Sequence, residues 1–445
     1  MRTYTLNGPF ALLPIGLFLC LFIGSGVYLT FMDVELAFYK LSPAVAILPA
    51  LVLAILFGRK SLSGNLSVFL EGVREKNIIT MCMIYLLAGA YTEVIKSVGG
   101  VDATVHLALH LIPREMTLPG VFLIGALVSM AMGTSMGTIA ALAPIAQGIS
   151  YSLGIDPAMM AGAVVSGAMF GDNLSMISDT TIASTQIHGC SLKDKFKINA
   201  LVAFVPMIIT LFLFALSEEG EVRTLCDTVP YALIFTLPYV LVLTLALLGA
   251  NVFVVLFTGL LVGGAIGLAF IPDYTILTFV GSIFAGYQSM NEILILSLLI
   301  GGLSELAKDQ GGLLFLIHAT DSVVRRWAKK AQGSRVAEGA ISAIVSFCDL
   351  CTANNTVAII LSGEATHEIA KKYHISPART AALVNIFSCV FQGILPYSAQ
   401  ILLAGSIAGV SPLAIIPYVY YCYLLGIGAI LSIIFRWPSV RIKTS

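Results

Sequence analysis

The sequence contains little charge. Asp, Glu, Lys and Arg together make up 11% of its 445 residues, whereas hydrophobic residues make up 58%. A soluble globular domain usually has about 25% charged residues. Apolar stretches recur along the whole chain, and many of them approach the roughly 20 residues that cross a bilayer as a helix. The composition excludes a soluble protein and predicts an all-α polytopic membrane protein whose main partner is the lipid bilayer.

The sequence also lacks a charge imbalance and a convincing metal motif. The 24 basic and 24 acidic residues cancel, and the basic residues are dispersed, so no nucleic-acid partner is expected. The eight cysteines lie mostly inside apolar stretches, where a small buried residue is the simplest interpretation. Cys348 and Cys351 form a C-x-x-C, but no second pair or partnering histidines accompany them. No cofactor is therefore expected.

Hydropathy, with Pro, Gly and charge as punctuation, predicts ten transmembrane helices. They lie near residues 10–31, 42–57, 78–96, 157–189, 198–216, 229–248, 250–270, 291–307, 377–408 and 412–435. Two further segments, 117–153 and 336–372, are too long for one span and are interrupted by "MGTSMGT" and "CDLCTANNT". Their arms of about 15 residues are too short to cross. We therefore expect two re-entrant hairpins.

The basic residues predict the orientation of the chain. With both termini in the cytoplasm, 20 of the 24 basic residues fall on the cytoplasmic side, as the positive-inside rule requires. Lys193, Lys195 and Lys197 are assigned to a cytoplasmic loop in this arrangement. No lysine or arginine is then expected near the centre of a span.

The two halves of the chain resemble each other. "YLLAGAYTEVIKSVGG" from Tyr85 aligns with "SLLIGGLSELAKDQGG" from Ser297, and "TSMGTIA" from Thr134 aligns with "TANNTVA" from Thr352. Matched spans run in opposite directions in the predicted orientation, so the repeat is inverted. Inverted repeats are typical of secondary transporters, which bind their ligands at the repeat interface near the bilayer midplane. The predicted organisation is a first repeat at 1–216, an outer linker at 217–228 and a second repeat at 229–445.

Each repeat contains one span with a polar interruption. "GDNLSMISDTT" from Gly171 aligns with "FQGILPYSAQ" from Phe391, which predicts broken helices at 157–189 and 377–408. Pro396 removes a backbone donor from the second of them. At such breaks, unwound carbonyl groups coordinate cations and half-helix N-termini face anions. We expect both breaks and both hairpin tips to converge on one volume.

The acidic residues in these segments predict the chemistry. A charged Asp inside the bilayer costs at least about 2.5 kcal/mol, so Asp172, Asp179 and Asp349 need a cation, a proton or several hydrogen bonds. Oxygen ligands suit hard cations, and two carboxylates in one pocket raise each other's proton affinity. This is the requirement for cation/proton exchange. We predict that Asp179 binds Na⁺ or a proton and that Asp172 shares the charge compensation. The alternative is that the aspartates cap half-helices.

The predicted site residues belong to three groups. The cation- and proton-binding group is the first break: Asp172, Asn173, Ser175, Ser178, Asp179, Thr180 and Thr181. The hairpin tips contribute Thr134, Ser135, Thr138, Asp349, Thr352, Asn354, Asn355 and Thr356. The second break contributes Gln392, Ser398 and Gln400. Outside these groups, Glu93 with Lys96 and Glu305 with Lys308 are expected to form ion pairs at i,i+3 spacing.

"FGDNLSMISDTT" resembles the signature of the NhaC-type sodium/proton antiporters, a G-D-x-x-S-P-x-S-D-T-T pattern in a broken helix. Seven residues match: Gly171, Asp172, Ser175, Ser178, Asp179, Thr180 and Thr181. Met176 replaces the usual proline, and Asn173 stands where many members have lysine. The resemblance implies a sodium/proton antiporter of the bacterial inner membrane. It also implies the layout of the ion-transporter superfamily, whose members often form homodimers and move a transport domain like an elevator.

Two other functions are compatible with parts of the pattern. Asn354, Asn355, Gln392 and Gln400 offer more amides than a bare cation requires, which fits a sodium- or proton-coupled transporter of a small organic solute such as an amino acid or carboxylate. The absence of a core arginine disfavours a dicarboxylate. An intramembrane aspartyl protease is the third possibility, but an inverted repeat has no evident role in hydrolysis. We therefore expect a transporter rather than an enzyme.

Overall fold

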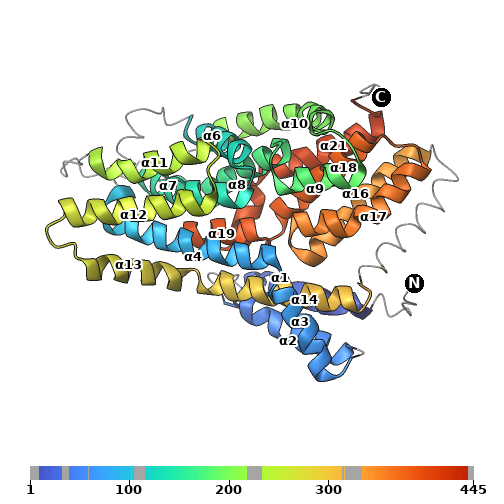
Figure 1. Ribbon diagram of the computed structural model, residues 1–445, viewed down its shortest axis with the longest axis horizontal. Coiled ribbons are helices and arrows are strands. Elements are labelled where there is room, and N and C mark those ends of the chain that lie inside the picture. Colours follow the sequence, from blue (N-terminus) through green and yellow to red (C-terminus); the bar gives the residue numbers. More distant parts are fainter. Residues whose placement is uncertain are drawn as a thin grey trace.

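The computed structural model describes residues 10–32, 40–58, 60–101, 103–104, 116–217, 233–312, 315 and 333–438. Throughout these ranges the regular structure is helical and no strand occurs, which confirms the all-α prediction (Figure 1). Among them, four helices are long and apolar enough to cross a membrane, or up to six if each bent pair is one span. The chain is a multi-pass membrane protein. The predicted number of ten spans and the inverted orientation of the repeats stay predictions.

The helices of the first half follow the predicted segments closely. They are η1 (Phe10–Leu12), α1 (Leu13–Phe31), α2 (Pro43–Phe57), α3 (Leu62–Val73), α4 (Lys76–Ser97), α6 (Thr117–Met132), α7 (Ser135–Leu153), α8 (Pro157–Leu174), α9 (Asp179–His188) and α10 (Leu192–Ala215). Several begin after a capping side chain that accepts a free backbone N–H, as Thr134 does for α7 and Asp156 does for α8.

The second half has a similar order of elements. They are η4 (Leu233–Thr236), α11 (Leu237–Leu247), α12 (Val252–Phe270), α13 (Ile276–Ser289), α14 (Asn291–Asp309), α16 (Gly333–Thr352), α17 (Asn355–Lys372), α18 (Pro377–Ile394), α19 (Ala399–Ala408), α20 (Pro412–Ile415), η5 (Ile416–Tyr418) and α21 (Tyr420–Phe435). The predicted outer linker at 217–228 lies outside the described residues except for Ser217.

Two features of the helices differ from the sequence prediction. Helix α13 was not predicted, because its 14 residues form too short an apolar run to register as a span. It packs on α4 so closely that a Cβ atom on Gly286 would lie 2.3 Å from the carbonyl oxygen of Gly89. Helix α10 begins at Leu192, six residues before the predicted 198, because its charged first turns lower the local hydropathy although Ser191 caps them. Lys195 therefore lies in a helix and not in a loop.

Both long hairpin segments consist of two helices with a short break. The first pair, α6 and α7, is interrupted at Gly133 and Thr134, and the second, α16 and α17, at Ala353 and Asn354. Gly133 and Ala353 both adopt positive φ, 69° and 50°. Thr134 and Asn354 then cap the following helices. The interruptions are where the polar sequence predicts them, although α16 begins three residues before the predicted 336.

Both predicted broken helices are interrupted as well. Helix α8 ends at Leu174 and α9 begins at Asp179, whereas α18 ends at Ile394 and α19 begins at Ala399. The bounds of α18 and α19 lie 220 residues after those of α8 and α9. The same offset relates the caps Thr134 and Asn354. The sequence alignment paired Thr134 with Thr352, two residues before its structural counterpart Asn354. It did so because it matched one threonine with another and not the positions of the two breaks.

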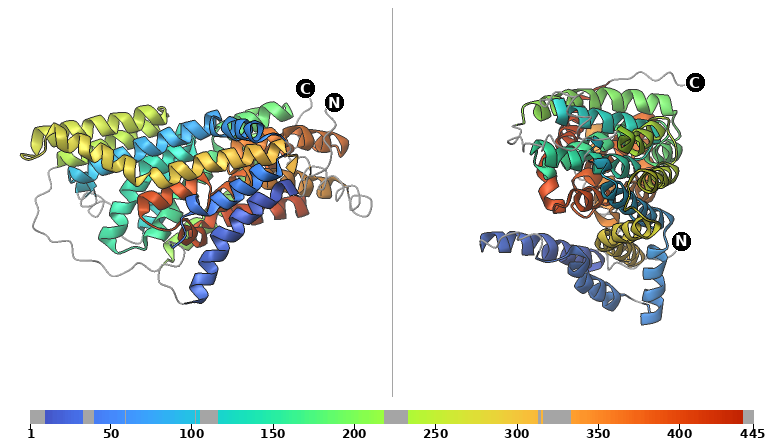
Figure 2. Two further views of the ribbon diagram at one scale, coloured as in Figure 1. Left: turned by 90° about the horizontal axis from the view of Figure 1, so that it is seen from below. Right: turned by 90° about the vertical axis from the view of Figure 1, so that its left-hand side faces the viewer.

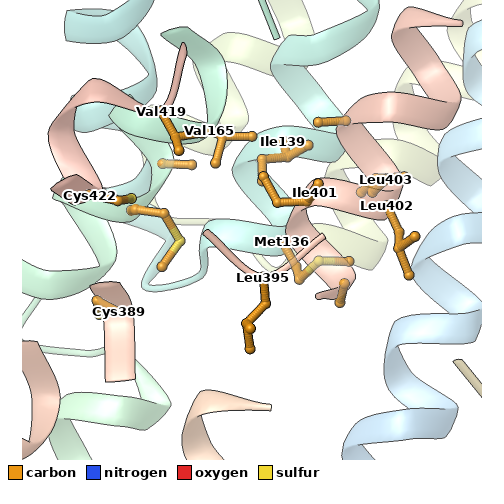
Figure 3. Packing of buried hydrophobic residues seen from close by; sticks show 14 of the residues in the cluster. Met136, Ile139, Val165, Cys389, Leu395, Ile401, Leu402, Leu403, Val419 and Cys422 are labelled. Carbon is orange, nitrogen blue, oxygen red and sulfur yellow. The ribbon is translucent and has the colours of Figure 1, made fainter. Parts of the chain in front are cut away.

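The helices form a main body with a smaller layer beside it. In Figure 2 the N-terminal helices α1–α3, in blue, lie to one side of the remaining helices. Helix α14 packs against α2 and α3, and Phe18 of α1 contacts Tyr397 edge-on at 5.6 Å between ring centroids. Within the body, Met136 and Ile139 of α7 pack with Leu402 and Leu403 of α19 and with parts of α8 (Figure 3). This apolar packing holds the polar breaks in place.

Candidate functional site

One cavity of about 100 Å³ is lined by both hairpin tips, by both broken helices and by α4. Its walls consist of Asn77, Thr80, Met81, Ile84, Gly133, Thr134, Ser135, Met136, Asp172, Asp179, Thr180, Asn354, Asn355, Thr356, Gln392 and Gln400. The four polar interruptions are far apart in the sequence, yet they share this space. The cavity therefore brings together ten of the residues that the sequence singled out.

Asp172 is the buried carboxylate of the cavity. It lies in the last turn of α8 and is only 4% exposed. Its Oδ2 accepts a hydrogen bond from Ser135 Oγ at 2.9 Å, and its Oδ1 accepts one from Thr180 Oγ1 at 3.2 Å. The carboxylate thus joins the first hairpin tip to the first turn of α9. Two oxygens and two hydroxyls at one point form a set of hard ligands for a small cation.

Asp179 occupies a different position in the same cavity. It is the first residue of α9 and is exposed. Among the described residues it has no hydrogen-bond or ion-pair partner. Its charge is favourable at the positive end of the helix dipole. The structure therefore puts Asp172 on the buried wall and Asp179 on the accessible wall, and the predicted roles of the two carboxylates stay predictions.

The serines of the first break stabilise its backbone. Ser178 accepts the N–H of Thr181 at 3.3 Å and donates to the carbonyl of Asp172 at 3.2 Å, so it connects the end of α8 with the start of α9. Ser175 donates to the carbonyl of Met130 at 3.0 Å. Neither serine lines the cavity. Their role is to satisfy backbone groups that the break leaves without helical partners.

Lys195 is a residue of the site that sequence reasoning missed. Its side chain is 1% exposed, and Nζ donates to the carbonyl of Asn173 at 3.0 Å and to Thr181 Oγ1 at 2.6 Å. It also interacts electrostatically with Asp172. The prediction that Lys195 lies in a loop is therefore wrong. Lys195 and Asn199 are four residues apart and share one helix face, which was the available signal.

Asn173 points away from the cavity and into this second network. Its Oδ1 accepts from Asn199 Nδ2 at 2.8 Å, and its Nδ2 donates to Tyr421 Oη at 3.2 Å. Asn199 also donates to the carbonyl of Asn173 at 3.1 Å. The C-terminal end of α8 is thus held by a buried lysine and a buried amide. The positive charge of Lys195 interacts favourably there with the negative end of the helix dipole.

Two glutamines carry the polar network into the second break. Gln392 Nε2 donates to Gln400 Oε1 at 2.7 Å and to the carbonyl of Ala353 at 3.0 Å. Gln400 Nε2 donates to Ser135 Oγ at 3.0 Å, and Ser135 in turn donates to Asp172. Ser398 caps α19 and does not line the cavity. A continuous chain of hydrogen bonds therefore connects the two broken helices.

The second hairpin tip offers amides rather than hydroxyls. Asn354 accepts the N–H of Val357 at 3.0 Å, and Asn355 Oδ1 accepts that of Thr356 at 2.9 Å. Asn355 Nδ2 is buried without a partner among the described residues. Thr138 and Thr352 bond to nearby carbonyls and lie outside the cavity wall. The free amide of Asn355 is therefore the donor of this tip that remains available.

Asp349 lies apart from the cavity. It is fully buried in α16, and neither carboxylate oxygen has a hydrogen-bond partner among the described residues. An isolated charge there would be costly, so the group stays buried as a neutral acid or beside a cation. Among the residues that the structure describes, no cluster of three metal-ligating side chains is found.

Two ion pairs were expected outside the site. Glu305 and Lys308 form theirs at 2.9 Å, whereas Glu93 and Lys96 do not pair with each other.

Comparison with known proteins gives consistent matches. A sequence profile described as the Na⁺/H⁺ antiporter family matches residues 7–217. The chain is 26% identical to the Na⁺/H⁺ antiporter NhaC of Alkalihalophilus pseudofirmus, over 90% of this chain and 91% of the relative. It is 23% identical to NhaC of Bacillus subtilis, over 93% and 95%. It is also 23% identical to the malate-2H⁺/Na⁺-lactate antiporter of Bacillus subtilis, over 93% and 91%.

These matches span nearly the whole length of the relatives, and the profile match contains the first broken helix with its Gly171–Thr181 motif. They confirm the resemblance that the motif indicates. The chain is similar to Na⁺/H⁺ antiporters of the NhaC type over about nine-tenths of its length.

Proposed function

We propose that this protein exchanges Na⁺ for protons across a bacterial inner membrane by alternating access, with Asp172 as the carboxylate that both ions share. One observation carries the proposal: a buried carboxylate with hydroxyl neighbours sits in a cavity lined by all four polar breaks. Similarity to the Na⁺/H⁺ antiporter family supports cation antiport in general. The inverted repeat, with its site at the repeat interface, is part of this proposal.

The arrangement explains how Na⁺ and a proton compete. In this proposal the Ser135 and Thr180 hydroxyls rotate, so that they present lone pairs to Na⁺ instead of hydrogens to Asp172. A proton on Asp172 removes the charge that holds the cation. Asp179, on the accessible wall, raises the local concentration of cations and receives them on release.

The buried lysine limits the negative charge of the empty site. Asp172 and Asp179 together carry two negative charges, and Lys195 contributes one positive charge behind the break. We propose that Lys195 lets the first half of the cavity exist without a bound cation. A carboxylate pair without it would hold a cation or a proton more tightly and would release it more slowly.

The wall that α4 contributes to the cavity bears on the state of the transporter. Asn77, Thr80, Met81 and Ile84 in the first turns of α4 form one wall. In the orientation predicted from the basic residues, the N-terminal end of α4 lies on the cytoplasmic side. We infer that the site faces the cytoplasm in this conformation.

The test is Na⁺-driven proton movement in proteoliposomes that contain a pH-sensitive dye. Asp172→Asn removes the charge with little change in volume, and we expect it to abolish exchange. Asp179→Asn should retain exchange with a raised KM for Na⁺. Asp156→Asn is the matched control, because Asp156 caps the other end of α8, where asparagine caps equally well. Normal exchange by folded Asp172→Asn protein would overturn the proposal.

The second candidate is coupled transport of a small organic solute. The amides of Asn355 and Gln392 and a relative named as a malate/lactate antiporter favour it. Thermal stabilisation of the purified protein by amino acids and organic acids, with and without Na⁺, separates the two functions. Saturable stabilisation by a solute only when Na⁺ is present would favour solute transport, whereas stabilisation by Na⁺ alone favours cation exchange.

We also propose that the protein forms a homodimer. The molecular mass of the purified protein in detergent tests this.

A further inference from the structure

A second cavity, of about 300 Å³, lies on the other side of α19. Gln400, in the first turn of α19, faces the site cavity, whereas Leu402 and Gly405 in the following turns face the second one. Its opposite wall comes from the α13–α14 junction and from the start of α2. Helix α19 therefore lies between the two cavities.

The second cavity uses the repeat counterparts of the first. The alignment of Tyr85 with Ser297 sets an offset of 212 residues between α4 and α14. Four α4 residues line the site cavity: Asn77, Thr80, Met81 and Ile84. Their counterparts at this offset are Ser289, Glu292, Ile293 and Leu296, and all four line the second cavity. Both the helix face and the level along the helix agree, so the two cavities occupy equivalent places in the two halves.

The α14 wall of the second cavity carries a carboxylate, whereas the α4 wall of the site cavity carries none. Glu292, the counterpart of Thr80, is exposed and is the only charged residue in the described lining. Its Oε1 accepts a hydrogen bond from Ser42 Oγ at 2.6 Å. Ser289 and Ser406 add hydroxyls, and Ser406 Oγ donates to the carbonyl of Ser289 at 3.3 Å across the α19–α13 contact. The cavity thus combines apolar walls with hydroxyl groups and one negative charge, and these polar groups suit a small cation.

We propose that this second cavity is the cation pathway on the opposite membrane face and that Glu292 is its cation-attracting residue. The inference goes beyond the proposed function and rests on it. In an inverted repeat, the two halves exchange their conformations when access alternates. In this state the cavity lined by α4 gives access to the site. In the other state the cavity lined by α14, the counterpart of α4, gives that access. The contact from Ser406 to Ser289 then breaks as α19 moves.

The first test is labelling from each membrane face. Thr80→Cys and Glu292→Cys are treated with a membrane-impermeant maleimide in right-side-out and in inverted vesicles. We expect Thr80→Cys to react from the cytoplasmic face and Glu292→Cys from the outer face. Labelling of both from the same face would overturn the proposal, and this readout does not depend on transport. The unsubstituted protein gives the background. Among its thiols, burial raises the pKa of Cys190, in the loop after α9, to about 11, so it reacts slowly near neutral pH.

The second test is the sidedness of the Na⁺ KM. Glu292→Gln removes one charge from the second cavity only, so we expect the KM for Na⁺ on the outer face to rise about fivefold at low ionic strength while the cytoplasmic KM stays the same. The effect should shrink at high salt, because screening weakens attraction at a distance. Glu305→Gln, a carboxylate nearer the other end of α14, is the matched control and should leave both values unchanged. An equal change on both faces, or none, would contradict the role of Glu292.

Discussion

Replacing Lys195 by methionine tests the electrostatic argument directly. Methionine keeps most of the apolar stem and removes the charge. In the native structure Nζ makes two charge-assisted hydrogen bonds, to the Asn173 carbonyl and to Thr181 Oγ1. The carbonyl keeps its bond from Asn199, so only Thr181 loses its partner in this network. The loss of the hydrogen bond from Lys195 to Thr181 lowers the free energy of unfolding by at most about 1.5–3 kcal/mol. Because burying the lysine also costs desolvation energy, we expect a net destabilisation of about 1–2 kcal/mol.

The functional effect of Lys195→Met should be larger than the effect on stability. Without the positive charge, Asp172 holds a proton more tightly, and release of that proton requires a higher pH. We expect the pH profile of Na⁺/H⁺ exchange to shift upward by about one unit, which corresponds to about 1.4 kcal/mol. The apparent affinity for Na⁺ at high pH should increase at the same time, because the cation meets less positive charge.

The assay compares the pH profile in proteoliposomes with thermal unfolding of the same preparation. Lys197→Met is the matched control: it lies on the same helix two residues further on, is 63% exposed and pairs with Asp194 only at 3.8 Å. An exposed pair of this kind contributes about 0–1 kcal/mol, so neither the profile nor the stability should move. If Lys195→Met behaves like Lys197→Met in both measurements, the proposed charge balance is wrong.

Two further predictions concern the second half of the site. Gln400→Ala removes the donor to Ser135 and the acceptor of the hydrogen bond from Gln392. We expect the KM for Na⁺ to rise about tenfold, because one or two hydrogen bonds of about 1 kcal/mol each are lost. An unchanged KM would show that the network does not position Ser135. Asp349→Asn should keep exchange and change the unfolding free energy by no more than about 1 kcal/mol, because asparagine matches the size and polarity of a carboxyl that is buried as a neutral acid. Loss of Na⁺-driven proton movement would instead show that Asp349 binds a transported cation or proton.

Much of the fold could be predicted because its signals are local. Apolar runs predict membrane helices, and the breaks coincide with Gly133 and with caps such as Thr134 and Ser178. Helix α13 was missed because a short apolar run between other spans gives no separate signal. The start of α10 was missed because hydropathy counts Lys195 as a loop residue, whereas tertiary contacts bury it.

The candidate site was predicted in composition but not in arrangement. The sequence indicated the four polar breaks, and the cavity is lined by residues from all of them. It did not indicate that Asp172 is buried and Asp179 exposed, because both belong to one polar motif. Their difference depends on position: Asp172 lies in the last turn of α8 and is hydrogen-bonded to the first hairpin tip, whereas Asp179 begins α9 on the accessible wall.

The sequence by itself determined that the chain is a helical membrane protein with two pairs of polar breaks, because hydrophobicity, glycine, proline and capping residues act over a few neighbouring positions. Only the tertiary structure decided which carboxylate is buried, that Lys195 reaches the back of the break, and that Glu292 faces a second cavity. These properties depend on contacts between different helices, from 14 residues apart for Lys195 and Thr181 to 250 for Ser42 and Glu292, and no local pattern records such contacts.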